Sequence, residues 1–190
     1  MSSDNPPGAG NQQERPLTAE WVVGFVDGEG CFSVPIFRNA TCRLGWQVQP
    51  EFAVVQGERS VNVLHALKAF FGCGVVTVNH RHDNHRQDIW RFGVRRLGDL
   101  VTQIIPFFEY YPLLTAKAGD FASFAKAVRL MEKGVHLSMD GLHQLAAIAQ
   151  TINRRKPSQL MESSEAIRQP PASDISGEDM VLASRRREGS

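Results

Sequence analysis

The stretch WVVGFVDGEG, residues 21–30, decides the fold, because three glycines and two acids share it with a run of apolar side chains. The apolar residues recur at a spacing of three to four, which predicts a helix with one buried side. Thr18 can cap the start of this helix, and Gly30 can end it. Gly24 and Gly28 lie four residues apart on one face and carry no side chains, so another helix can approach closely. A close helical partner is therefore expected.

Asp27 and Glu29 stand at the C-terminal end of this predicted helix. The helix dipole is negative there and disfavours an anion by about 0.3–1 kcal/mol, so a positive group should compensate. A divalent cation, which prefers hard oxygen ligands, is the simplest candidate. If the partner helix is a second copy, two carboxylates meet and their repulsion strengthens the case for a metal. A D-G-E-G string is also common in solvated turns, and the residues alone leave both readings open.

Residues 22–30 resemble the nine-residue signature of the LAGLIDADG homing endonucleases, whose positions are matched by Gly24, Asp27, Gly28 and Gly30. Glu29 occupies the position of the catalytic acid, where Asp is the commoner residue in that family. The likeness extends through Lys117 to about Arg155. A glutamate also binds a divalent ion through carboxylate oxygen, so the departure is conservative.

The resemblance implies a site-specific endonuclease that uses Mg²⁺, or Mn²⁺, to make a double-strand break in a long pseudo-palindromic DNA target. It implies that Glu29 and the Gly28 carbonyl bind the metal, that Gln56 positions water, and that Lys117 lies near the scissile phosphate. One register of the alignment would place Thr115 there instead. The chain holds a single copy of the signature, so the resemblance also implies a homodimer with an interface formed by Trp21, Gly24 and Gly28.

Periodicity along the chain predicts an α+β fold of the order αββαββα. The apolar and polar residues alternate in the predicted strands, with Phe32, Val34 and Ile36 inward and an interruption at Pro35. We expect an antiparallel four-stranded saddle with helices packed on one face, followed by C-terminal helices. The predicted strands are 31–37, 46–56, 75–79 and 89–94, and the predicted helices after the first are 61–71, 97–108, 113–131 and 139–153. Residues 16–156 form the predicted domain, between disordered segments 1–15 and 157–190.

The net charge is only +1, but its distribution is uneven. Residues 1–37 hold one basic and five acidic residues, whereas residues 38–97 hold nine basic and four acidic ones. A basic sheet suits a surface that binds phosphate, with double-stranded DNA as the partner. Outward Gln side chains can contact adenine, although they are also ordinary on a protein surface. The candidate DNA-binding residues are Ser33, Arg38, Asn39, Arg43, Gln47, Gln49, Thr77, Asn79, Arg81 and Arg91.

Other classes of function find little support in the sequence. Three cysteines without a C-x-x-C pair indicate neither a disulfide framework nor a zinc knuckle, and a reducing intracellular compartment, bacterial cytoplasm or organelle matrix, is expected. No apolar run approaches the length of a membrane span, and no secretory signal or small-molecule site is indicated. His80, His82 and His85 with Asp83 could bind a transition metal, or superficially resemble a His-Asn-His nuclease, but that motif needs a ββα-metal context.

Two further functions stay open beside the endonuclease. The same fold could have lost cleavage and act as an RNA maturase or a DNA-binding regulator. The chain could also be a plain α+β dimerisation domain. The acid at position 29 together with Gln56 favours the enzyme, because a pure binding protein has no need of them.

Overall fold

The computed structural model describes residues 16–79 and 88–152. The predicted segments 1–15 and 157–190, and the candidate metal ligands His80, His82, Asp83 and His85, therefore lie outside the described residues. The elements follow in this order: α1 Ala19–Glu29, β1 Gly30–Ser33, β2 Ile36–Arg38, β3 Trp46–Val48, β4 Glu51–Gly57, a 3₁₀ turn Glu58–Ser60, α2 Val61–Phe71, β5 Val75–Asn79, β6 Ile89–Val94, α3 Leu97–Asp99, a π-helical turn Leu100–Ile104, α4 Ile105–Tyr110, α5 Lys117–Glu132, a 3₁₀ turn Val135–Leu137 and α6 Met139–Thr151.

Helix α1 has the boundaries that the sequence predicts. The backbone N–H of Trp21 donates to Thr18 Oγ1 at 3.3 Å, and Gly30 is the C-cap. Val22 and Val26 are fully buried and form the inward side of the helix. The helix passes directly into β1 at Gly30. Only glycine fits at this junction, because a Cβ there would lie 2.5 Å from Val26 Cγ1. Glu29, the last residue of α1, is thus held beside the first strand.

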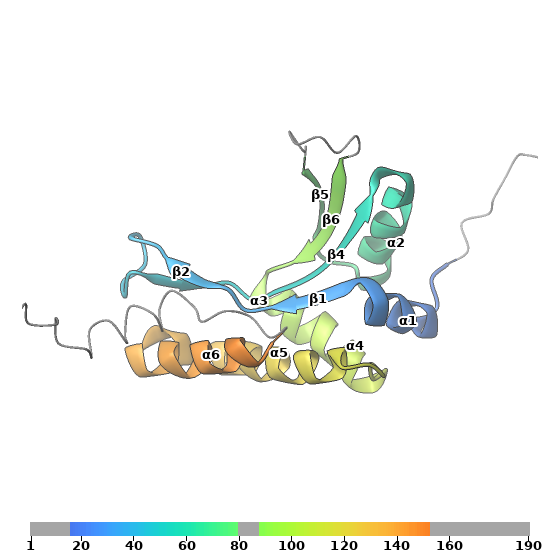
Figure 1. Ribbon diagram of the computed structural model, residues 1–190. Coiled ribbons are helices and arrows are strands. Elements are labelled where there is room, and N and C mark those ends of the chain that lie inside the picture. The colour runs from blue at the N-terminus through green and yellow to red at the C-terminus, as the bar shows by residue number, and fades with distance from the viewer. Residues whose placement is uncertain (1–15, 80–87, 153–190) are drawn as a thin grey trace, which may run out of the picture.

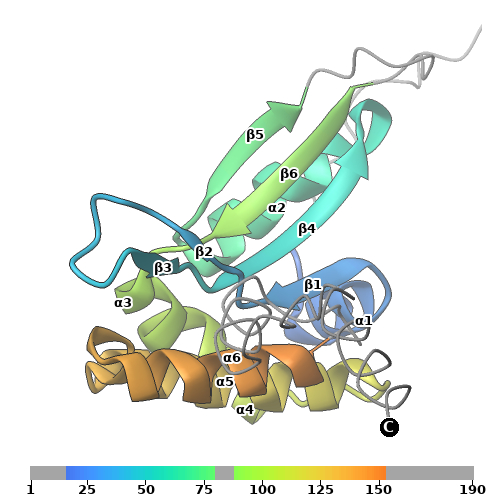
Figure 2. The same ribbon diagram turned by 60° about the vertical axis from the view of Figure 1, so that its left-hand side comes forward.

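Four strands form an antiparallel sheet in the order β1-β4-β6-β5, which confirms the predicted α+β architecture. The sheet curves, and the described helices lie on its convex side while the concave face stays open (Figure 1). Strands β2 and β3 form a separate two-stranded ribbon that continues past β1 (Figures 1 and 2). The interruption predicted at Pro35 is confirmed, since it separates β1 from β2.

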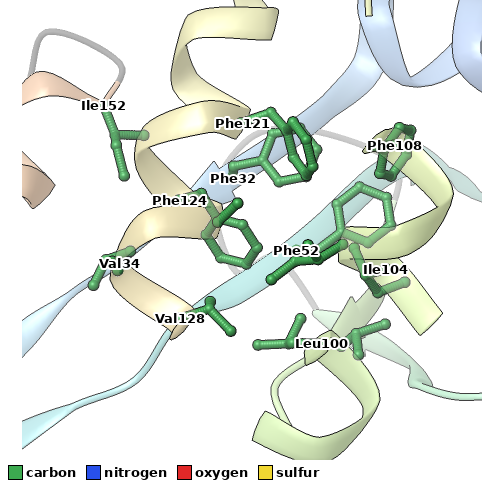
Figure 3. Packing of buried hydrophobic residues seen from close by; sticks show 14 of the residues in the cluster. Phe32, Val34, Phe52, Leu100, Ile104, Phe108, Phe121, Phe124, Val128 and Ile152 are labelled. Carbon is green, nitrogen blue, oxygen red and sulfur yellow. The ribbon is translucent and has the colours of Figure 1, made fainter. Parts of the chain in front are cut away.

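The core lies between the convex face and the helices, and phenylalanines fill its centre (Figure 3). The ring of Phe32 lies 5.2 Å from that of Phe52, 5.6 Å from Phe108 and 5.3 Å from both Phe121 and Phe124, measured between centroids. Aromatic rings at these separations attract one another beyond the gain from burial. This core fixes the strands of the sheet against α4 and α5.

Local details differ from what periodicity predicts. Glu51 lies on the outward side of its strand, as alternation predicts, but it is only 6% exposed because two arginines cover it. Leu114, expected on the buried side of a helix, is 86% exposed, because α5 begins only at Lys117. The helix predicted over residues 97–108 continues to Tyr110 and is divided into α3, the π-helical turn and α4. The π-helical turn precedes Pro106, which occupies one of the first positions of α4, where the missing N–H is not required.

Among the described residues, no helix is both long and apolar enough to cross a membrane.

Candidate functional site

Two of the predicted catalytic residues, Glu29 and Gln56, lie side by side at the end of α1 and near the end of β4. Gly30 is paired with Val54 across β1 and β4, which places Gln56 next to the last residue of the helix. Gln56 Nε2 donates to Glu29 Oε2 at 3.3 Å. Glu29 is exposed, so the remainder of its carboxylate is open to a ligand from outside.

Lys117 joins the same cluster from the first turn of α5. Its ammonium donates to the carbonyl of Gly30 and, at 3.4 Å, to that of Gly28. Both carbonyls lie at the negative end of α1, so Lys117 supplies positive charge where the sequence requires it. Thr115, the alternative in the alignment, binds Asp27 instead.

Asp27 is already engaged by the loop before α5. Its carboxylate accepts hydrogen bonds from the N–H of Leu114 at 2.8 Å, from the N–H of Thr115 at 3.3 Å and from Thr115 Oγ1 at 2.7 Å. Partial burial raises the pKa of Asp27, but these hydrogen bonds and the Lys117 charge outweigh it and lower the pKa below its usual value of 3.8. Asp27 therefore anchors the loop that delivers Lys117, and Glu29 is the acid left open.

The donor atoms at this end of α1 fit a hard divalent cation. Glu29 offers carboxylate oxygen and Gly28 a carbonyl oxygen, the ligand types that Mg²⁺ prefers. Within the described ranges 16–79 and 88–152, no group of three or more His, Cys, Asp or Glu gathers to hold a metal. The described residues of one copy therefore offer at most part of the oxygen ligands that such a cation would need.

The glycine face of α1, defined by Trp21, Gly24 and Gly28, is open in the single chain. A Cβ added at either glycine would meet no atom within 4 Å. Trp21 is 42% exposed, and its ring stacks on that of Phe25 with centroids 4.7 Å apart. The face is accessible to a second helix, and its role as a dimer interface stays a prediction.

Three of the candidate DNA-binding residues lie on the open face of the sheet. Thr77 is paired with Arg91 across β5 and β6, and Ser33 is paired with Glu51 across β1 and β4. Thr77 is exposed, whereas Ser33 is half-buried. Asn79 belongs to β5, but the structure does not describe its side chain, and Arg81 lies outside the described residues.

The remaining candidates belong to the β2–β3 ribbon and divide between its two faces. Asn39 Nδ2 donates to Gln47 Oε1 at 2.6 Å. Arg38 lies over the ring of Trp46 at 4.8 Å, on the face opposite Gln47, since residues paired across two strands share a face. Arg43 donates to the carbonyl of Leu137 at 2.7 Å and so ties the ribbon to the helical layer.

The tenth candidate, Gln49, is half-buried in the bend between β3 and β4. The candidates whose side chains the structure describes therefore do not form one continuous surface, and DNA contact by each of the ten stays a prediction.

Sequence reasoning missed a charged cluster on the open face, formed by Glu51 at the start of β4 with Arg91 and Arg95. Arg91 Nη2 donates to Glu51 Oε2, and Arg95 Nε donates to Glu51 Oε1 at 2.9 Å. Alternation does predict that the acid and the two bases point to the same side of their strands. It does not predict that they meet, because the register between β4 and β6 is set by packing and is not encoded locally.

The family profile described as LAGLIDADG endonuclease matches residues 22–128. A probable intron-encoded endonuclease 3 of Neurospora crassa is 35% identical over 134 residues, which cover 70% of this chain and 24% of that protein. The DNA endonuclease I-CeuI of Chlamydomonas moewusii is 26% identical over 125 residues, which cover 64% of this chain and 56% of that protein. The chain spans about a quarter to a third of the length of the first curated relatives it matches.

Two solved structures resemble the chain over most of its length. The homing endonuclease I-TnaI is 42% identical, with a TM-score of 0.72, and the match covers 80% of this chain and 99% of that one. The structure of I-SmaMI bound to an uncleaved DNA target in the presence of calcium ions is 31% identical, with a TM-score of 0.71. That match covers 78% of this chain and 49% of the I-SmaMI chain.

Proposed function

Because the chain belongs to the LAGLIDADG endonuclease family, we propose that it is a site-specific homing endonuclease that breaks both strands of DNA by metal-dependent hydrolysis of phosphodiester bonds. The observation that carries the proposal is the convergence of Glu29, Gln56 and Lys117 at one end of α1. These residues come from three separate elements, and a fold that only binds DNA has no need to assemble them.

Each residue of this cluster has a distinct chemical part. A bound Mg²⁺, or Mn²⁺ in its place, would polarise the phosphate and lower the pKa of water, and Glu29 with the Gly28 carbonyl would hold it. The amide nitrogen of Gln56 donates to the Glu29 carboxylate, and its amide oxygen would orient a water molecule. Lys117 donates to the Gly28 carbonyl, and its positive charge would stabilise the negative charge that develops on a phosphate bound beside it.

The open concave face is proposed as the DNA surface. The described helices leave it uncovered, and the two-stranded ribbon extends it (Figure 2). A two-stranded ribbon fits the major groove of B-DNA. The binding of I-SmaMI to DNA in the presence of calcium ions supports both double-stranded DNA and a divalent cation as partners of this chain.

A homodimer is proposed because one chain supplies one Glu29 and leaves the glycine face of α1 open. The match to about half of the I-SmaMI chain supports two copies acting as one enzyme. In a two-fold dimer joined through that face, two Glu29 carboxylates would approach opposite strands, and the target would be long and pseudo-palindromic. Cys31, Cys42 and Cys73 form no disulfide, which suits the reducing intracellular compartment that we propose.

Cleavage of a randomised duplex library tests the proposal. We expect the parent protein to cut a subset of sequences with Mg²⁺ and to cut nothing with a chelator, and we expect Glu29→Gln to bind the same sequences without cutting them. Glu58→Gln, which removes an equal charge from an exposed position, is the matched control and should cut like the parent. DNA binding without cleavage by the parent would favour the inactive maturase or regulator, and no binding would favour a dimerisation domain.

Sedimentation of Gly24→Leu tests the dimer. A leucine there would fill the space that a second helix needs, so we expect a monomer at concentrations where the parent is dimeric. Gly119→Leu is the matched control, because Gly119 also lies on an exposed helical position with no atom within 4 Å of an added Cβ. A dimer that persists in Gly24→Leu would refute the proposed interface.

A further inference from the structure

Glu51 is unusual among the described residues because it is a buried acid on a face that is otherwise open. Only 6% of it is exposed, and it is the sole buried charged residue in the described part of the chain. Burial of a carboxylate is costly unless it is paired and hydrogen-bonded. Here both oxygens are occupied, one by Arg91 and the other by Arg95.

The backbone beneath Glu51 is shaped to receive it. Gly93 lies on β6 opposite Ala53, and a Cβ at Gly93 would stand 2.9 Å from Glu51 Oε1. The absence of a side chain there lets the carboxylate lie flat between the strands. The position of this acid is therefore built into the sheet as well as into its ion pairs.

The arginines remain partly available to a ligand. Arg91 donates to Glu51 through Nη2 alone, and Arg95 donates through Nε alone. Their side chains are 37% and 54% exposed, so the guanidinium groups reach the surface of the concave face. One carboxylate also cancels one of the two positive charges, which leaves a cluster that is well oriented but only weakly positive.

We infer that Glu51 is a positioning residue that determines DNA specificity, by holding Arg91 and Arg95 in one geometry suited to base edges. The inference rests on the proposed function, in which this face binds DNA. Arg pairs with guanine through two parallel hydrogen bonds in the major groove, which requires a defined orientation of the guanidinium plane. A free arginine instead reaches phosphates, which carry no sequence information.

Two variants separate this role from a purely structural one. Glu51→Gln removes the charge and loosens both arginines, so general affinity for DNA should rise while discrimination falls. Gly93→Ala keeps all three charges but displaces the carboxylate, so discrimination should fall without a gain in positive charge. Glu58→Gln, with an equal loss of charge at an exposed position, should raise general affinity without changing discrimination.

The experiment is a binding selection with full-length protein in a Glu29→Gln background, so that no DNA is cut. A randomised duplex library is sequenced after selection by the background protein, and the affinity for the preferred duplex is compared with that for one fixed random-sequence duplex. For Glu51→Gln we expect this ratio to fall about tenfold, the value of one or more base contacts. The slope of log affinity against log salt should steepen by about 0.9, as one freed arginine contacts a phosphate. Thermal unfolding of each variant is measured in parallel.

A lower ratio in Glu51→Gln and Gly93→Ala, with the ratio of Glu58→Gln unchanged, supports the inference. An unchanged ratio in both variants overturns the inference and leaves the proposed function intact. This includes the case in which a variant loses affinity equally for both duplexes. If the background protein binds no duplex at all, the proposed function fails and this inference fails with it.

Discussion

Two glutamates lie near opposite ends of β4 and differ in almost every physical respect. Glu29 is exposed, stands at the negative end of α1 and has one hydrogen bond of 3.3 Å from Gln56. Glu51 is 6% exposed and binds two arginines. The contrast shows how the same strand has an open acid beside one end and, at the other, an acid that organises the side chains around it. Substitutions of the two glutamates and of the residues around Glu29 test this contrast, chiefly through the free energy of unfolding.

The largest change is expected for Glu51→Ala. Loss of the carboxylate leaves Arg91 and Arg95 without their acceptor, and we expect a loss of about 1–3 kcal/mol, below the value for a fully buried pair because both arginines are partly exposed. Urea unfolding measures it. Glu58→Ala is the matched control and should change stability by less than about 0.5 kcal/mol. Equal effects of the two substitutions would show that burial of Glu51 has no energetic consequence.

A smaller loss is expected for Lys117→Met, which keeps most of the length and apolar volume of the side chain. The variant leaves the carbonyls of Gly28 and Gly30 without their ammonium donor, and we expect stability to fall by about 1 kcal/mol. Cleavage should fall more than stability does, because the charge near the phosphate is also lost. Lys126→Met, at an exposed position of the same helix, provides the reference for both measurements.

Glu29→Gln should change stability in the opposite direction. Without metal, removal of an anion from the C-terminal end of α1 should raise the free energy of unfolding by about 0.3–1 kcal/mol. The parent and the variant are compared by urea unfolding in the presence of a chelator. A clear loss of stability would mean that Glu29 has a structural role like that of Glu51, and the comparison would collapse.

The smallest effect is expected for Asp27→Asn, and it is present at neutral pH and disappears in acid. The pKa of Asp27 is lower in the folded chain than its usual value of 3.8, so its contribution is present above that pH and is lost as the pH falls through the folded value. Stability of the parent should therefore drop more steeply below about pH 4 than that of Asp27→Asn. Unfolding measured between pH 2 and pH 6 tests this, and parallel curves would contradict it.

Much of this molecule could be predicted from sequence because its patterns are local. Helices α1 and α2 and strands β5 and β6 lie where periodicity and glycine place them, since each is marked by an alternation or a helical stripe bounded by a breaker. The prediction of Glu29, Gln56 and Lys117 as one site came from family resemblance, and the structure brings the three together.

The failures have a common cause, which is that they depend on pairing between distant segments. The burial of Glu51 depends on the register of β4 against β6. The exposure of Leu114 depends on a loop that is held by Asp27, 87 residues away in sequence. No local pattern contains either of these long-range contacts. Alternation therefore predicts the side of the strand on which Glu51 lies, but not the arginines that bury it.

The breaks in the two long strands occur at the same level, at Val34–Pro35 in one and at Gln49–Pro50 in the other. The N–H of Gln49 donates to the carbonyl of Pro35 at 3.0 Å, so a hydrogen bond between the two strands stabilises the bend. The β2–β3 ribbon beyond the bend can consequently be changed in length or sequence independently of the four-stranded sheet. Inserting residue pairs into β2 and β3, or replacing the loop between them, would alter how far along a duplex the protein reaches while the end of α1 keeps its place.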